Sequence, residues 1–295
     1  MKTRKTQALW AAVTTMSLSL MVGSASAQDT ASDRAKVMAG TMPGHVERAD
    51  KLIGKEVIGS DNQKLGKINN FVIDLDSGRI LYTVISTGGF LGIEERDVAV
   101  PPKAFTQTEA DTVQLAVDKQ KLTDAPQFKT EYLRKEGSSQ PSYVQQVYAY
   151  FGESPWWNKT ASGEPSLNDV HRATTLIGMT VENLSNERIG KVEDLGVDLT
   201  MGRAVFAIIS PASKLSLGDN YLALPPTTLS WNSEQKALNC NCSNEKLSAA
   251  PRFASDNWSN LSSPTFVTQV YGYYGKQWMN DKGVRPTGRP IELQK

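Results

Sequence analysis

The residues best suited to chemistry in this sequence are two cysteines and two histidines. Cys240 and Cys242 stand two positions apart, whereas His45 and His171 lie far from both cysteines and from each other. A zinc site needs three or four ligands at short, characteristic spacings, which these residues do not provide. We therefore expect no metal and no other cofactor.

The two cysteines leave three alternatives open. In an internal repeat of the chain they align with Leu115 and Val117, and alternate positions on a strand face the same side, which favours two buried thiols. A disulfide between residues i and i+2 requires local distortion, because extended backbone holds the two side chains in poor geometry. A redox or metal-binding role is the third alternative.

Aspartates also recur at matching positions of the chain. Asp74 is repeated as Asp198, and Asp76 adds a second carboxylate beside the first. Paired carboxylates can divide acid and base roles, but aspartates at a hairpin entrance more often accept hydrogen bonds from turn amides. The common nucleophile, zinc-hydrolase and phosphate-loop motifs do not occur in the sequence. We predict structural aspartates in a protein that is not an enzyme.

Large apolar side chains near Pro and Gly are the candidates for partner binding. Trp156 and Trp157 follow one expected helix and Trp278 follows another, while Phe90 and Leu91 lie on a glycine-flanked loop. Exposed rings of this kind anchor protein contacts. The alternative for the tryptophans is that they fold back over the end of the preceding domain.

The chain repeats itself at an offset of 124 residues. Residues 52–105 match residues 176–229 at 17 of 54 positions, where chance gives roughly three or four. The sequence PSYVQQVYAYFG at 141–152 returns as PTFVTQVYGYYG at 264–275. Because this period is too long for a solenoid repeat, we predict two copies of one domain, each with its own core.

Each copy is expected to contain five or six short strands and one helix. Alternating apolar residues predict strands over 68–75 and 192–199, with a bulge near 69–70 and 193–194, each followed by a hairpin turn with Gly. Short, highly bent strands favour closed sheets. Aromatic residues over 141–151 and 264–274 are spaced as one helical face. The predicted fold is mainly β with short helices: two tandem small β-barrels, each followed by a short aromatic amphipathic helix.

The N-terminus predicts export. Positive charges precede an apolar run, and small residues end at Ala27, so we expect a signal peptide cut between Ala27 and Gln28 and a periplasmic protein without a transmembrane segment. The formal charge of +1 argues against a nucleic-acid partner. The expected divisions are signal peptide 1–27, linker 28–50, domain 51–152, linker 153–174, domain 175–276 and a basic tail 277–295 that contacts an anionic surface weakly.

The first copy carries a family resemblance. The run LIGKEVIGSDNQKLGKINNFVIDLDSGRILYTVI, followed by GGFLGIEERDVAVPPKAF, resembles the PRC-barrel family, found in the photosynthetic reaction centre H subunit and in ribosome maturation factors. The resemblance covers about 52–122 and, in a more degenerate form, 176–247, where residues 212–216 replace the Gly-Gly-Phe-Leu-Gly loop of 88–92. It implies a barrel used for docking and assembly, without shared catalytic residues.

Two functional hypotheses follow. The leading one is a non-catalytic periplasmic binding or assembly module, with two barrels that contact a protein partner in the cell envelope. The alternative is an accessory protein of a membrane electron-transfer or photosynthetic complex, and it rests on likeness to the H subunit alone.

Overall fold

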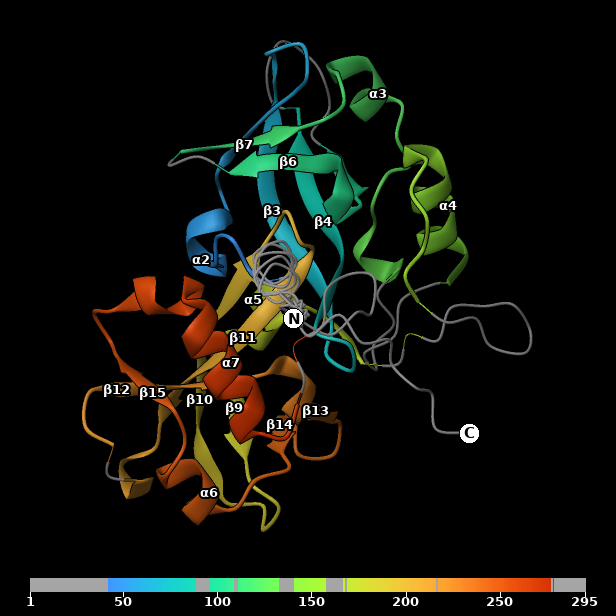
Figure 1. Ribbon diagram of the computed structural model, residues 1–295. Coiled ribbons are helices and arrows are strands. Elements are labelled where there is room, and N and C mark those ends of the chain that lie inside the picture. The colour runs from blue at the N-terminus through green and yellow to red at the C-terminus, as the bar shows by residue number, and fades with distance from the viewer. Residues whose placement is uncertain are drawn as a thin grey trace, which may run out of the picture.

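The computed structural model describes residues 42–88, 96–108, 111–132, 141–157, 167, 169–215, 217–276 and 278. The two halves of the chain occupy opposite ends of the molecule (Figure 1). The elements of the first half are β1 (Glu47–Arg48), α2 (Ala49–Leu52), β2 (Glu56–Ile58), β3 (Lys64–Asp74), β4 (Arg79–Thr87), β5 (Arg96–Val100), η1 (Pro102–Ala104), β6 (Phe105–Thr108), β7 (Thr112–Leu115), α3 (Lys119–Thr123), η2 (Thr130–Tyr132) and α4 (Pro141–Phe151).

The second half repeats this order. Its elements are β8 (Val170–Arg172), α5 (Ala173–Leu176), β9 (Thr180–Glu182), β10 (Arg188–Asp198), β11 (Arg203–Pro211), η3 (Ser213–Leu215), β12 (Asn220–Leu224), η4 (Pro226–Thr228), β13 (Leu229–Asn232), β14 (Ala237–Cys240), α6 (Asn244–Ser248), β15 (Arg252–Ala254), η5 (Trp258–Ser262) and α7 (Pro264–Tyr273). The class is therefore mainly β with short helices, as predicted.

Strands of the same rank pair in the same way in the two halves. β3 pairs with β4 and β10 with β11, and both ladders shift register at the predicted bulges, between Ile68 and Asn70 and between Val192 and Asp194. In each half a short strand, β2 or β9, also pairs in parallel with β7 or β14. The repeat in the sequence is thus a repeat in structure.

The aromatic helices cover their sheets as expected. Tyr148 of α4 donates its hydroxyl proton to the carbonyl of Leu81 at 2.8 Å, and Tyr271 of α7 donates to Val205 at the same distance. The faces of both helices that contain these tyrosines are buried. The phenol hydroxyls satisfy strand carbonyls that the helices remove from water, which fixes each helix on its sheet.

The expected closed barrels are not formed. The described strands make one sheet of fifteen strands that runs through both halves. β5 ends at Pro101–Pro102, and proline cannot continue a ladder, so β5 and β6 follow each other in the chain without pairing among the described residues. The free edge of β5 is instead bridged by Gln127, and that of β12 by β15. Covered edges remove the need for closure.

The halves meet at the two hairpin turns. Arg79 of β4 and Arg203 of β11 are direct partners in the ladder. On either side of them Ile80 donates its backbone N–H to the carbonyl of Gly202 at 2.9 Å, and Ala204 donates to Gly78 at 3.1 Å. These are the same two bonds with the halves interchanged, so a pseudo-two-fold axis passes between the arginines.

The halves also exchange their first elements. β1 pairs with β10 of the second half, with Arg48 opposite Gly196, and β8 pairs with β3 of the first half, with Arg172 opposite Val72. We call residues 46–52 the first arm and residues 170–176 the second arm. Parts of both were expected to be linker. The structure places β1, α2, β8 and α5 in these residues. The linker expectation rested on polar composition before the first copy and on Ser, Gly and Pro between the copies, neither of which excludes backbone hydrogen bonding to a strand edge.

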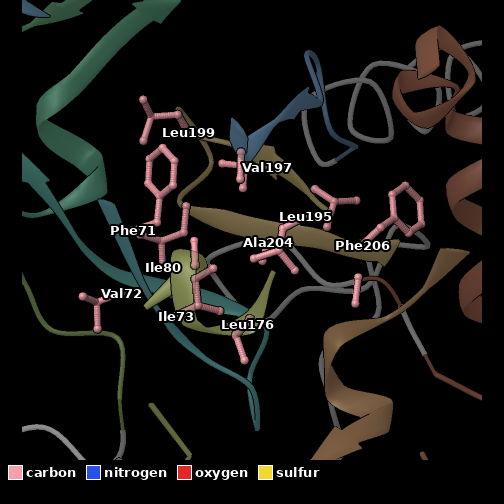
Figure 2. Close-up of a cluster of buried hydrophobic side chains, with 14 of the residues drawn as sticks. Phe71, Val72, Ile73, Ile80, Leu176, Leu195, Val197, Leu199, Ala204 and Phe206 are labelled. Atoms are coloured by element: carbon pink, nitrogen blue, oxygen red, sulfur yellow. The ribbon is translucent and has the colours of Figure 1, made fainter. Parts of the chain in front are cut away.

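One hydrophobic core extends across the junction. Figure 2 shows Ile73 and Ile80 of the first half together with Leu195, Val197 and Ala204 of the second half, and with Leu176 of the second arm. All of these side chains are buried. The expectation that each copy holds a separate core is therefore corrected: each arm buries its apolar residues in the other half.

Candidate functional site

The repeated aspartates hold the turns at the junction. Asp198 accepts hydrogen bonds from the backbone of Met201, the hydroxyl of Thr200 and the amide of Gly44 at 3.1 Å. Asp74 accepts from the backbone and hydroxyl of Ser77. Their predicted structural role is confirmed, since both side chains are almost completely buried and bonded to turn groups.

Asp74 has a strongly raised pKa in a buried position. Burial raises its pKa to about 6, and the nearby carboxylates of Asp76 and Asp169 add to the rise, while the hydrogen bond from Ser77 opposes it. Asp169 also lies 2.6 Å from Nε2 of His171. The Asp74 side chain is only 3% exposed, and its hydrogen bonds are to Ser77 of the adjacent turn. The raised pKa therefore reflects burial in a junction.

Each arginine of the junction lies over the ring of a tryptophan. The guanidinium carbon of Arg79 lies 5.1 Å from the centre of a Trp156 ring, and that of Arg203 lies 5.3 Å from a Trp278 ring. Residues directly opposite in an antiparallel ladder project to the same face of the sheet. The two arginine–tryptophan pairs therefore share one face, which we call the Arg–Trp face. Each arginine directly follows the turn glycine of its copy in the sequence, but its contact with a tryptophan is made between segments and could not be predicted from that position.

The tryptophans differ in exposure. Trp157 and Trp278 are 7% and 3% exposed, and they pack edge-on against Tyr148 and Tyr271 with ring centres 4.6 and 5.2 Å apart. The expectation of exposed anchors is therefore wrong at Trp157 and Trp278, and the alternative of rings that fold back holds. Trp156 is partly buried, donating its indole N–H to the Tyr148 hydroxyl at 3.1 Å. Phe90 and Leu91 lie outside the described residues.

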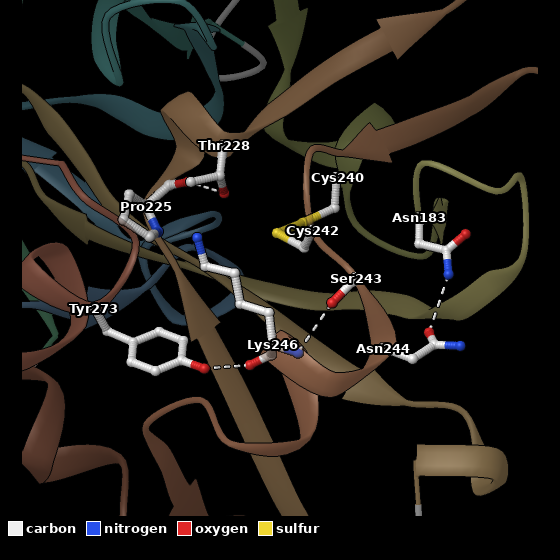
Figure 3. The surroundings of a disulfide bond; sticks show 9 residues. All are labelled: Asn183, Pro225, Thr228, Cys240, Cys242, Ser243, Asn244, Lys246 and Tyr273. Carbon is white, nitrogen blue, oxygen red and sulfur yellow. Dashed lines mark hydrogen bonds between the residues drawn. A yellow bond between two sulfur atoms is a disulfide. The ribbon is translucent and has the colours of Figure 1, made fainter.

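Cys240 and Cys242 form a disulfide (Figure 3). The expectation of free thiols is corrected, and the alternative that required local distortion holds. β14 ends at Cys240, where a hydrogen bond from the backbone N–H of Cys242 to the carbonyl of Cys240 closes a tight turn at 2.7 Å. This turn brings the two Cα atoms to 5.2 Å, within the range that a disulfide spans. Both residues remain buried, as their alignment with apolar residues predicted.

Replacing both cysteines by alanine is expected to lower the free energy of unfolding by about 1.5 kcal/mol, because a bridge across so short a loop restrains the unfolded chain only modestly. Urea unfolding monitored by fluorescence measures the change. The wild-type protein unfolded with a reductant present provides the control and should show the same loss. An unchanged midpoint in both samples would contradict a stabilising bridge.

The short helix α6 follows the disulfide, and a tyrosine hydrogen bond holds it as another holds the equivalent helix α3. Ser243 caps α6 by accepting from the backbone of Lys246 at 3.2 Å, and the hydroxyl of Tyr273 donates to the carbonyl of Lys246. Tyr150 makes the same bond to Lys121 of α3. Beside α6 an open groove of about 650 Å³ is lined by Ala249, Ala250, Pro251, Arg252, Thr268, Gln269, Gly272 and Tyr273. Mostly neutral side chains give this groove no evident chemistry.

The family follows from comparison with known proteins. The PRC-barrel domain model matches residues 44–122 and 168–242, which is more than half of the chain. The chain belongs to the PRC-barrel family. Both family matches begin upstream of the expected domain starts and include the two exchanged arms. Among curated proteins, none matches the chain.

Two observations hold for the part of the PRC-barrel chain that the structure describes. No group of three or more His, Cys, Asp or Glu side chains there is arranged to hold a metal ion. No helix in the same ranges has the length and apolar character needed to cross a membrane. The residues that do converge, at the Arg–Trp face, have the side-chain types that dominate protein contacts.

Proposed function

We propose that this PRC-barrel protein is a non-catalytic binding or assembly module that meets a protein partner in the cell envelope. The observation that carries the proposal is the Arg–Trp face, where the partly exposed Arg79 and Trp156 of the first half lie beside the buried Arg203 of the second half. Trp and Arg are the residues most enriched at binding hot spots. The acidic side chains nearby hold turns in place.

Export to the periplasm is part of the proposal. The disulfide supports it, because such bonds form and persist in oxidising compartments. The expected signal peptide, residues 1–27, lies outside the described residues.

Trp156→Ala is expected to weaken partner capture at least tenfold, since truncating a hot-spot ring costs about 2 kcal/mol or more. The full chain, immobilised, is incubated with envelope extract, and bound protein is quantified by mass spectrometry. Trp231→Ala is the matched control, since Trp231 is also partly buried but lies on β13. Equal recovery by the wild type and both variants would remove the Arg–Trp face from the proposal.

A further inference from the structure

The pseudo-two-fold axis relates two contacts that differ in charge. At the bulge of β3 stands Asn70, whose side-chain amide donates to the hydroxyl of Thr174 at 2.7 Å and whose oxygen accepts from the backbone of Thr174 at 3.3 Å. Thr174 belongs to the second arm. This contact is neutral, so its hydrogen bonds do not depend on the protonation of either side chain.

The equivalent contact on the other side of the axis is charged. Asp194 at the bulge of β10 is completely buried and accepts from Nε of Arg48 at 2.9 Å and from the backbone of Asp50 at 3.3 Å. The same guanidinium also binds the carboxylate of Asp50, with Nε 2.8 Å from Oδ1. Two carboxylates thus share one guanidinium, and both Arg48 and Asp50 belong to the first arm.

The surroundings supply little other charge. Arg48 and Asp50 are the charged groups that face Asp194 from the first arm, while β11 places the apolar Ile208 opposite it. Glu193, next to Asp194 on β10, is exposed and interacts with Tyr221. With both carboxylates ionised, Arg48, Asp50 and Asp194 together carry one negative charge in excess. Asp194, which bears part of this charge, has no access to water.

We propose that Asp194, which shares the guanidinium of Arg48 with Asp50, is a proton-binding latch, in which uptake of one proton from solvent tightens the hold of the first arm on the second half. The proton adds to a carboxylate oxygen, and no other bond is made or broken. Binding one proton removes the excess negative charge and leaves one carboxylate paired with Arg48. The Asn70–Thr174 contact cannot respond in this way, because its groups do not titrate.

The direction of the effect follows from linkage. The pKa of Asp194 is raised to about 6, mainly by burial and in part by the carboxylate of Asp50, while the backbone of Leu195 and Arg48 oppose the rise. A group whose pKa is higher in the closed state than in the open state stabilises the closed state as the pH falls through that pKa. The arm should therefore open less often at pH 5 than at pH 7.5.

Hydrogen exchange of the intact protein, followed by mass spectrometry and corrected for intrinsic rates, measures opening of the first arm. Between about pH 7.5 and about pH 5 the opening constant of residues 47–52 should fall roughly tenfold in the wild type. In Asp194→Asn, which copies the Asn70 contact, it should not change. Asp74→Asn is the matched control: it removes another buried carboxylate whose pKa is about 6 but should leave the response of the first arm intact.

A second variant, Asp50→Asn, keeps the proposal testable if Asp194→Asn does not fold. The side chain of Asp50 is 42% exposed, so Asp50→Asn should fold normally, and by removing the competing carboxylate it should shift the response to lower pH. Three results would each overturn the proposal: no change in the wild type, the same change in Asp194→Asn, or loss of the first-arm response in Asp74→Asn.

Discussion

Leu176→Ala is expected to lower the free energy of unfolding by about 2–5 kcal/mol, the usual range for truncation of a buried leucine. Leu176 lies in α5 of the second arm, is only 1% exposed, and packs at the junction among side chains of both halves (Figure 2). The loss should appear in urea unfolding as a lower midpoint. Since the core is shared, the two halves should still unfold in one transition.

The matched control for this change is Thr175→Ala, one position earlier on the same helix. Thr175 is exposed, so its truncation should alter stability by no more than about 0.5 kcal/mol. Hydrogen exchange then shows where protection is lost. Leu176→Ala should reduce protection in both halves, whereas loss confined to residues 170–276 would mean that the halves are independent.

Gly202→Ala is expected to cost about 2–5 kcal/mol. Gly202 has φ of +64°, where an L-residue costs about 1–2 kcal/mol. A Cβ there would also lie 2.6 Å from the Cβ of Pro102 in the other half. Relieving such an overlap typically costs about 1–3 kcal/mol more, because the proline ring is held next to the end of β5.

Gly78→Ala separates the two contributions to that cost. Gly78 is the equivalent turn residue, with φ of +66°, but a Cβ there would meet its nearest atom at an ordinary 3.5 Å. Only the backbone cost of about 1–2 kcal/mol is expected. Denaturation of the two variants side by side measures the difference. Equal losses would show that the proline of the first half does not press on the second turn.

Much of the local structure could be predicted because the sequence contains two copies of it. The bulges, the glycine turns and the tyrosine faces of α4 and α7 appear at equivalent positions in both copies. Positions that are apolar in both copies are determined by the fold, since unrelated surface positions would diverge. These predictions are confirmed, and so are the hydrogen bonds of Asp74 and Asp198 to turn groups.

The exchanged arms could not be predicted by the same argument. A repeat shows which segments are equivalent, but both the exchanged and the unexchanged arrangement place equivalent residues in equivalent surroundings. A signal for the arms themselves was present: Val46, Arg48 and Ala49 return as Val170, Arg172 and Ala173. The repeat therefore begins before residue 52.

The candidate site was only partly predictable. Trp157 and Trp278 are buried because a tyrosine on each helix offers a ring to pack against, a contact between segments that the local sequence does not reveal. The disulfide depended on a tight turn after β14, where the aligned residues of the first copy suggested a continuing strand. The tryptophans are thus fixed by a tyrosine ring elsewhere in the chain, and the disulfide by a backbone hydrogen bond. Neither contact is visible in the residue types alone.

The exchange of arms is tested most directly by nuclear Overhauser effects between backbone protons in a deuterated sample of the whole chain. The structure predicts contacts between Arg48 and Gly196 and between Arg172 and Val72. Contacts between Arg48 and Val72 and between Arg172 and Gly196, each within one half, would contradict the exchange and with it the shared core.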